Sequence, residues 1–159
     1  MRRVLTLLLA CAGLALAGCS SPPDPEITFH AVGKTVVLSP TQYCDIGVEN
    51  CTAHADAAGT LRVPRGKPLQ ISVDSAVAKS AWAVVFTYRN AGGERQPDSR
   101  SKLFSPNEQF AYTLKLPEPG DQLESVEIQQ YGRRIEIDDQ GQIQFFARGT
   151  WVLSVDDRA

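Results

Sequence analysis

The chain has 159 residues, a formal charge of −2 and 43% hydrophobic residues. This length is enough for one domain with its own apolar core. The mild acidity, with no cluster of lysine or arginine, argues against a nucleic-acid partner, because phosphate binding requires a basic patch. It argues equally against an electrostatic attachment to anionic lipid.

The N-terminal segment is typical of a bacterial export signal. Arg2 and Arg3 precede an uncharged apolar run over residues 4–17. The run is too short for a permanent membrane-spanning helix and ends in Leu-Ala-Gly before Cys19. We therefore predict a cleaved lipoprotein signal peptide at residues 1–18, with acyl chains such as palmitate on Cys19. This places the protein at the outer face of the bacterial plasma membrane, held there by its acyl chains.

Residues 19–25 contain two serines and three prolines and are predicted to form a linker. An extended proline-rich segment rises about 3.1 Å per residue, so this linker reaches roughly 20 Å. Residues 26–159 then form one folded domain close above the membrane.

From residue 26 onward, apolar and polar residues alternate in short segments separated by turn residues. The turns are expected at Gly33-Lys34 and at residues 138–141. Only residues 74–80 allow a short helical turn. The pattern predicts an all-β fold, an immunoglobulin-like β-sandwich of about eight strands. The alternating segments are residues 27–32, 35–38, 60–63, 69–73, 82–88, 110–116, 126–129, 135–137, 143–145 and 151–155.

Two cysteines remain outside the signal and the lipidation site. Cys44 and Cys51 are closely spaced, and in an exported protein such a pair most simply forms a disulfide. The alternative is a metal site in which His54 joins the two thiolates. Because no fourth ligand stands out, we predict the disulfide and no metal.

Several motifs together carry a family resemblance. The sequence resembles the uncharacterised actinobacterial lipoproteins of the domain of unknown function 2771 family, over nearly the whole chain after Cys19. The resemblance implies an envelope protein anchored at the outer face of the plasma membrane, and it implies no activity and no catalytic residues. The motifs are Gln42-Tyr43-Cys44-Asp45, Asn50-Cys51-Thr52, Leu61-Arg62-Val63-Pro64, Trp82-Ala83-Val84-Val85-Phe86-Thr87-Tyr88 and Thr150-Trp151-Val152-Leu153-Ser154-Val155-Asp156-Asp157.

The residues that carry chemistry are scarce. His30 and His54 are the only histidines, and no Gly-x-Ser-x-Gly nucleophile motif is present. A hydrolase would need one of these histidines beside a carboxylate and a nucleophile in a cleft. We therefore predict no catalytic residues, no cofactor and no enzymatic activity.

The most favoured function is a non-enzymatic interaction or accessory module of the cell envelope, acting as a monomer. It would contact an envelope protein or a small ligand, and Tyr131, Arg133 and Arg134, expected at a turn, are its candidate ligand surface. The alternative is a carrier of a small lipid or sugar ligand between the sheets, in a cavity lined by four aromatic residues. These are Trp82, Phe86, Tyr112 and Trp151.

Overall fold

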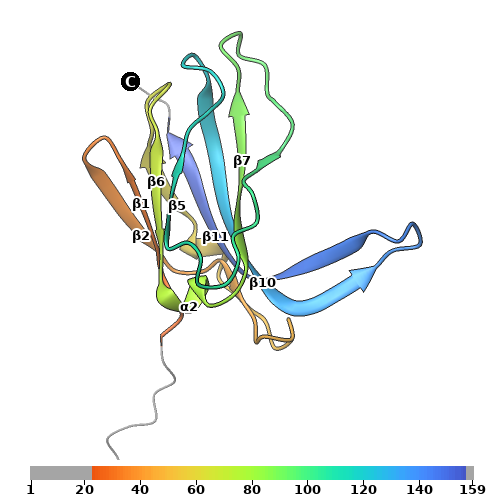
Figure 1. The fold of residues 1–159 in the computed structure, drawn as a ribbon. Coiled ribbons are helices and arrows are strands. Elements are labelled where there is room, and N and C mark those ends of the chain that lie inside the picture. Colours follow the sequence, from red (N-terminus) through yellow and green to blue (C-terminus); the bar gives the residue numbers. More distant parts are fainter. Residues whose placement is uncertain (1–22, 157–159) are drawn as a thin grey trace, which may run out of the picture.

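The computed structural model describes residues 23–156, in which two β-sheets face each other across an apolar core (Figure 1). The predicted all-β sandwich is confirmed, and the finer immunoglobulin-like arrangement stays a prediction. The predicted signal peptide, Cys19 and the start of the linker lie outside the described residues.

The smaller sheet has four strands in the order β2-β1-β6-β9, and all neighbours are antiparallel. In β1 and β6 every second side chain is buried, as the alternation of the sequence predicts. The strands are β1 (Ile27–Ala31), β2 (Lys34–Leu38), β6 (Leu69–Val73) and β9 (Ala111–Leu114).

The larger sheet has the order β4-β3-β11-β10-β7-β8, and β5 pairs in parallel with β11. Three of its strands have only two residues, too few to show an alternating pattern. Conversely, the segments predicted at residues 126–129 and 135–137 belong to one long strand, as do those at 143–145 and 151–155. The strands are β3 (Gln42–Tyr43), β4 (Thr52–Ala53), β5 (Gly59–Arg62), β7 (Trp82–Arg89), β8 (Ser99–Arg100), β10 (Gln122–Ile137) and β11 (Ile143–Asp156).

Turns and short helices lie close to their predicted places. The first hairpin turns at Val32 and Gly33, with φ angles of 46° and 73°, one residue earlier than predicted. The expected helical turn is α2 (Ser75–Ala78), which is capped by the Asp74 carboxylate. A 3-10 turn, η1 (Ala55–Ala57), follows β4. Between residues 23 and 156, no helix has the length and apolar character needed to cross a bilayer.

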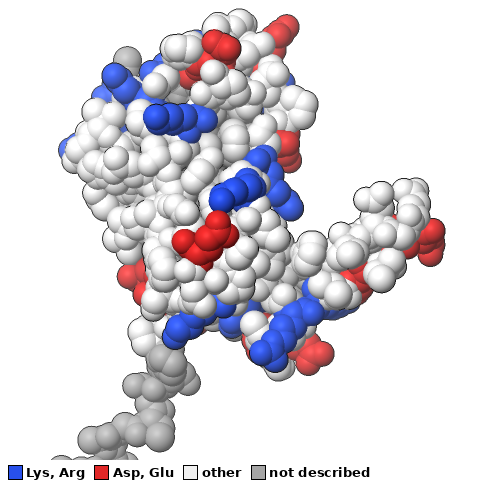
Figure 2. Space-filling view, in the orientation of Figure 1, with Lys and Arg blue, Asp and Glu red and all other residues white. Residues whose placement is uncertain are grey.

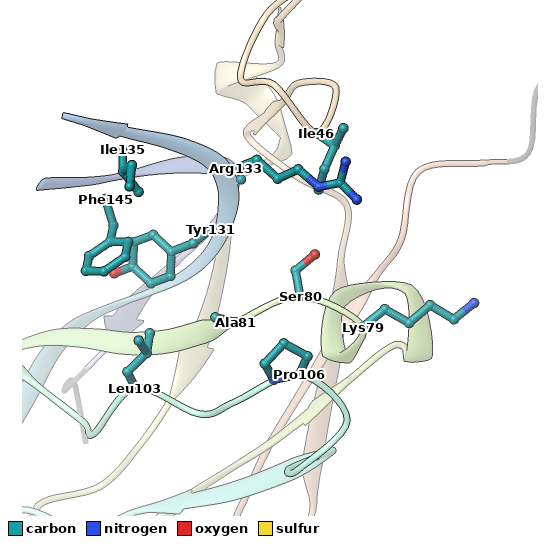
Figure 3. Close-up of a pocket in the computed structure, with 11 residues that line it drawn as sticks. Ile46, Lys79, Ser80, Ala81, Leu103, Pro106, Tyr131, Arg133, Ile135 and Phe145 are labelled. Carbon is teal, nitrogen blue, oxygen red and sulfur yellow. The ribbon is translucent and has the colours of Figure 1, made fainter.

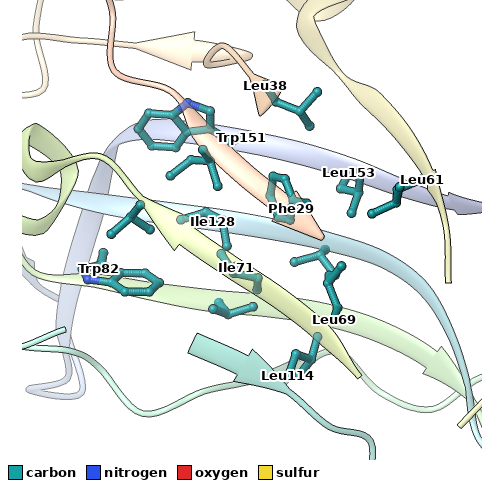
Figure 4. Packing of buried hydrophobic residues seen from close by; sticks show 14 of the residues in the cluster. Phe29, Leu38, Leu61, Leu69, Ile71, Trp82, Leu114, Ile128, Trp151 and Leu153 are labelled. Carbon is teal, nitrogen blue, oxygen red and sulfur yellow. The ribbon is translucent and has the colours of Figure 1, made fainter. Parts of the chain in front are cut away.

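Side chains from both sheets fill the core (Figure 4). Trp82 and Trp151 are fully buried, and the Trp82 ring packs against Phe104 with centroids 4.4 Å apart. Each indole N–H donates to a backbone carbonyl: Trp82 Nε1 to Gln109 at 3.1 Å and Trp151 Nε1 to Pro25 at 3.0 Å. The hydrogen bond from Trp151 joins Pro25, near the start of the described residues, to the body of the sandwich.

Candidate functional site

The outer parts of β10 and β11 leave the sandwich together as a two-stranded hairpin, which we call the arm (residues 133–147; Figure 1). Ile135 pairs with Phe145 and Ile137 with Ile143, so these four side chains share one face of the arm. The predicted turn closes the hairpin, where Asp138 Oδ1 accepts hydrogen bonds from the amides of Gln140 and Gln142.

The arm begins at a bend in β10. The register with β11 shifts between Gln130 and Tyr131 and again before Ile135. At this irregularity the amide of Arg133 donates to the carbonyl of Ile46 at 2.8 Å. A Cβ at Gly132 would collide with Val48 Cγ2 and the Ile46 carbonyl. The sequence prediction of a turn at residues 131–134 is wrong, because these residues continue β10 through a bulge.

The loop that touches this bend is closed by a disulfide between Cys44 and Cys51, as predicted. The alternative metal site is therefore wrong, since both sulfurs are covalently bonded to each other. Within the loop, Asp45 accepts hydrogen bonds from the amides of Glu49 and Gly47 at 2.8 and 3.0 Å. These bonds, first that of Glu49, hold the pKa of the Asp45 carboxyl below its ordinary value.

Arg148 fastens the root of the arm to the same loop. Its Nε and Nη2 both donate to the carbonyl of Cys44, at 3.1 and 2.9 Å. Its guanidinium also lies over the ring of Tyr43, 4.7 Å from the centroid. Burial raises the pKa of the Tyr43 hydroxyl, and the nearby Arg148 charge partly opposes that shift. The disulfide loop and the arm root thus form one connected base.

Between the arm and the sandwich lies a cleft of about 430 Å³, a volume within the usual range for small-ligand sites (Figure 3). Its walls are apolar on both sides. The arm side is formed by Tyr131, Ile135 and Phe145, and the body side by Ala81, Leu103 and Pro106.

The apolar side chains of the cleft and arm are unusually exposed. Phe145 and Ile135 are 54% and 55% exposed, Leu103 is 46% exposed, and Ile143 and Ile137 reach 57% and 69%. Figure 2 shows the arm standing out from the body, with charged side chains mainly at its root and tip. Exposed apolar surface of this kind makes the arm and cleft a candidate interaction surface.

Two cationic side chains border the cleft, Lys79 and Arg133. In Figure 3 their charged ends lie on the side away from Phe145 and Ile135. Among residues 23–156, neither side chain takes part in a hydrogen bond or ion pair that the structure records, and no carboxylate lines the cleft. The cleft therefore combines an apolar part with a cationic part.

The candidate surface predicted from sequence is only partly assembled. Tyr131 and Arg133 line the cleft, whereas Arg134 pairs with Glu136 and stacks on Phe146, 4.7 Å from the ring centroid. Tyr131 is mostly buried, donates its hydroxyl to Gln129 Oε1 at 2.8 Å, and has its pKa raised by burial.

Sequence reasoning missed Lys79, Leu103, Ile135 and Phe145 as site residues. Apolar and polar residues do alternate along the sequence of the arm. A strand with this pattern is normally interpreted as one whose apolar face covers a core. Lys79 and Leu103 join the cleft from β-sandwich segments far from the arm in sequence, and no local pattern marks them.

The histidines lie elsewhere. His30 on β1 contacts Thr35 Oγ1 through Nδ1 at 2.9 Å. His54 lines a separate hollow of about 380 Å³ with Ser39 and Asp56, yet no hydrogen bond recorded in the described part joins its ring to either. Nor do residues 23–156 hold a group of three or more His, Cys, Asp or Glu side chains arranged for a metal ion.

Fold and site together define a two-sheet β-domain that carries a projecting hairpin and an exposed, largely apolar cleft at its root. The family model described as "Protein of unknown function (DUF2771)" matches residues 20–156, so the chain belongs to this family. The resemblance seen in the sequence is thereby confirmed. Uncharacterised proteins of Mycobacterium bovis and Mycobacterium tuberculosis are each 26% identical over 121 residues, which cover 73% of this chain and 71% of each relative.

Proposed function

We propose that the protein is a lipid-anchored lipoprotein at the outer face of the bacterial plasma membrane, where it serves as a non-enzymatic interaction or accessory module of the cell envelope. The observation that carries this proposal is the exposed apolar face of the arm, with the cleft at its root. Burying such a face against a partner is favourable, at roughly 25 cal/mol per Å² of apolar surface removed from water.

The short linker adds a geometric argument. Pro25 is buried and hydrogen-bonded to Trp151, so the chain is already part of the body at this residue. An acylated Cys19 would therefore keep the domain within roughly 20 Å of the bilayer. A module held so close meets membrane proteins and lipids, and its arm increases the surface that it presents to them.

The filled core favours recognition on the outside of the sandwich over carriage between the sheets. Trp82 and Trp151 are fully buried, and Tyr112 packs on Phe104 with centroids 5.3 Å apart. A ligand in their place would have to displace close-packed side chains. The separate hollow at His54 has no base-to-nucleophile hydrogen bond, which lends the hydrolase reading little support.

The test is site-specific photo-crosslinking in cells, followed by mass spectrometry. A photoreactive residue replaces Leu103 in the cleft, and a control replaces Val37, which is 51% exposed on β2. We expect an envelope component to be captured from position 103 alone, and to be lost in the Cys19→Ala form. Equal capture from both positions, or none from position 103, would contradict the proposal.

A further inference from the structure

We propose that the cleft at the root of the arm binds a single-chain anionic amphiphile, specifically a long-chain carboxylate. This inference rests on the proposed function in taking the cleft as the recognition surface, and it names the chemistry recognised there. Three properties of the cleft carry it: an apolar strip of limited width, a cationic border, and two backbone amides at the arm root that already have hydrogen-bond partners.

The apolar strip matches one hydrocarbon chain. It begins between Leu103 and Phe145 and continues along the arm over Ile135, Ile143 and Ile137. Ile135 and Ile137 lie two residues apart on a regularly paired part of β10, so at about 3.3 Å per residue they extend the strip by roughly 7 Å beyond the cleft. A cleft of about 430 Å³ lies in the lower half of the range for ligand sites, which suits one chain better than two.

The cationic border supplies the partner for a headgroup. Lys79 and Arg133 are exposed and no acidic side chain lines the cleft, so a carboxylate bound at either cation does not compete with an acidic neighbour there. Hydrogen bonds between ionised groups are about twice as strong as neutral ones. Figure 3 places both charged ends at the opposite side from Phe145, which gives the cleft the polarity of an amphiphile.

A carboxylate fits this border better than a phosphate. Phosphate groups are commonly held by backbone N–H groups at the start of a helix. The residues of the cleft that adjoin α2 follow its last residue, since Lys79 and Ser80 come after Ala78. The border thus offers one ammonium and one planar guanidinium, whose paired donors fit a carboxylate or a phosphate, and its lining residues include none of the helix-start amides that would favour a phosphate.

An extended peptide fits less well, because peptide strands gain affinity from main-chain hydrogen bonds to a free edge. At the root of the arm, two amides of β10 already have hydrogen-bond partners. The amide of Tyr131 donates to the carbonyl of Ala81, and the amide of Arg133 to that of Ile46, both at 2.8 Å. The cleft therefore offers a ligand mainly side-chain contacts, and these are the only contacts that an acyl chain requires.

The experiment measures displacement of a fluorescent long-chain carboxylate from the exported Cys19→Ala chain by palmitate, with hexadecanol as the uncharged competitor. We expect one saturable site, and palmitate to bind about tenfold more tightly than hexadecanol, the scale of one charge-assisted hydrogen bond. Phe145→Asp should abolish this saturable binding of the fluorescent carboxylate, whereas the control Val37→Asp should not. Both positions are about half exposed, and unchanged thermal unfolding of each variant excludes misfolding.

Charge variants identify the headgroup contact. Lys79→Gln and Arg133→Gln should each weaken palmitate several-fold and leave hexadecanol unchanged. Equal affinity for the two competitors, or palmitate binding insensitive to Phe145→Asp, would overturn the inference, as would tighter binding of a single-chain phosphate. If no lipid binds while position 103 still crosslinks an envelope protein, the ligand assignment fails and the interaction module stands.

Discussion

The sandwich body and the arm are built from the same kinds of residue and use them in opposite ways. Ile71 and Ile128 in the body are fully buried between the sheets, whereas Ile135 and Ile137 on the arm are more than half exposed. All four residues lie on strands in which apolar side chains alternate with polar ones. The difference lies in what covers the apolar face: a second sheet in the body, and in the arm nothing within the described residues. The body uses its apolar residues for stability, whereas the apolar residues of the arm stay exposed to solvent.

The largest expected effect separates the two regions by stability. Trp151→Ala removes a fully buried ring that contacts Tyr43 and anchors Pro25, and it should cost about 3–5 kcal/mol. Phe145→Ala removes a half-exposed ring on the arm and should cost less than about 1 kcal/mol. Equilibrium urea unfolding of both variants measures the difference. Similar losses would show that the arm is part of the cooperative core.

The disulfide connects the two regions, and its removal gives the next largest effect. Replacing Cys44 and Cys51 together by serine frees the loop in the unfolded state and should lower the free energy of unfolding by about 2 kcal/mol. The loop also holds the arm through the Ile46 carbonyl, so the Arg133 amide should exchange its hydrogen faster. Unfolding and hydrogen exchange are measured on the oxidised and substituted proteins. Faster exchange in the core strands, with no change at the Arg133 amide, would contradict this connection between the loop and the arm.

A smaller effect is expected at the bend. Gly132→Ala places a methyl group against Val48 and the Ile46 carbonyl, and relief of that overlap should cost about 1 kcal/mol, the lower end of the range for overpacking, and shift the arm relative to the loop. Gly47→Ala in the disulfide loop is the matched control, because its Cβ would meet Asp45 Oδ1 at 3.4 Å and Glu49 Cγ at 3.9 Å, both ordinary contact distances. Thermal unfolding and palmitate displacement compare the two. Equal behaviour of both variants would show that the bend tolerates a side chain.

The smallest effect concerns pH. The pKa of Asp45 in the folded protein lies below its ordinary value, chiefly through the Glu49 amide, so its contribution to stability is present at pH values above 3.8. That contribution is lost as the pH falls through the folded pKa, when the protonated carboxyl no longer accepts these bonds as strongly. Carboxyl NMR titration of Asp45, with hydrogen exchange of the Glu49 amide, follows the change. A titration midpoint above the ordinary value would reverse the sign.

The same comparison shows how far the sequence could be read. Alternation along residues 69–73 and 82–88 predicted strands of the body, and Cys44 and Cys51 predicted their bond, because these signals are local. Tyr131 and Arg133, singled out as a tyrosine beside arginines, both line the cleft, and their role in binding stays a prediction. Arg134 as a ligand contact stays a prediction: its side chain pairs with Glu136, two residues along the same strand, and stacks on Phe146, and it does not line the cleft.

The sequence by itself determined the period of the strands, the turn at residues 138–141, the disulfide and the family, because each depends on residues close together in the chain or on a pattern spread along it. Tertiary structure alone decided that the two long strands run past the sandwich, that their apolar face is left uncovered, and that Lys79 and Leu103 meet it across a cleft. Those contacts join segments distant in sequence, and an alternating strand has the same pattern whether its apolar face meets a core or solvent.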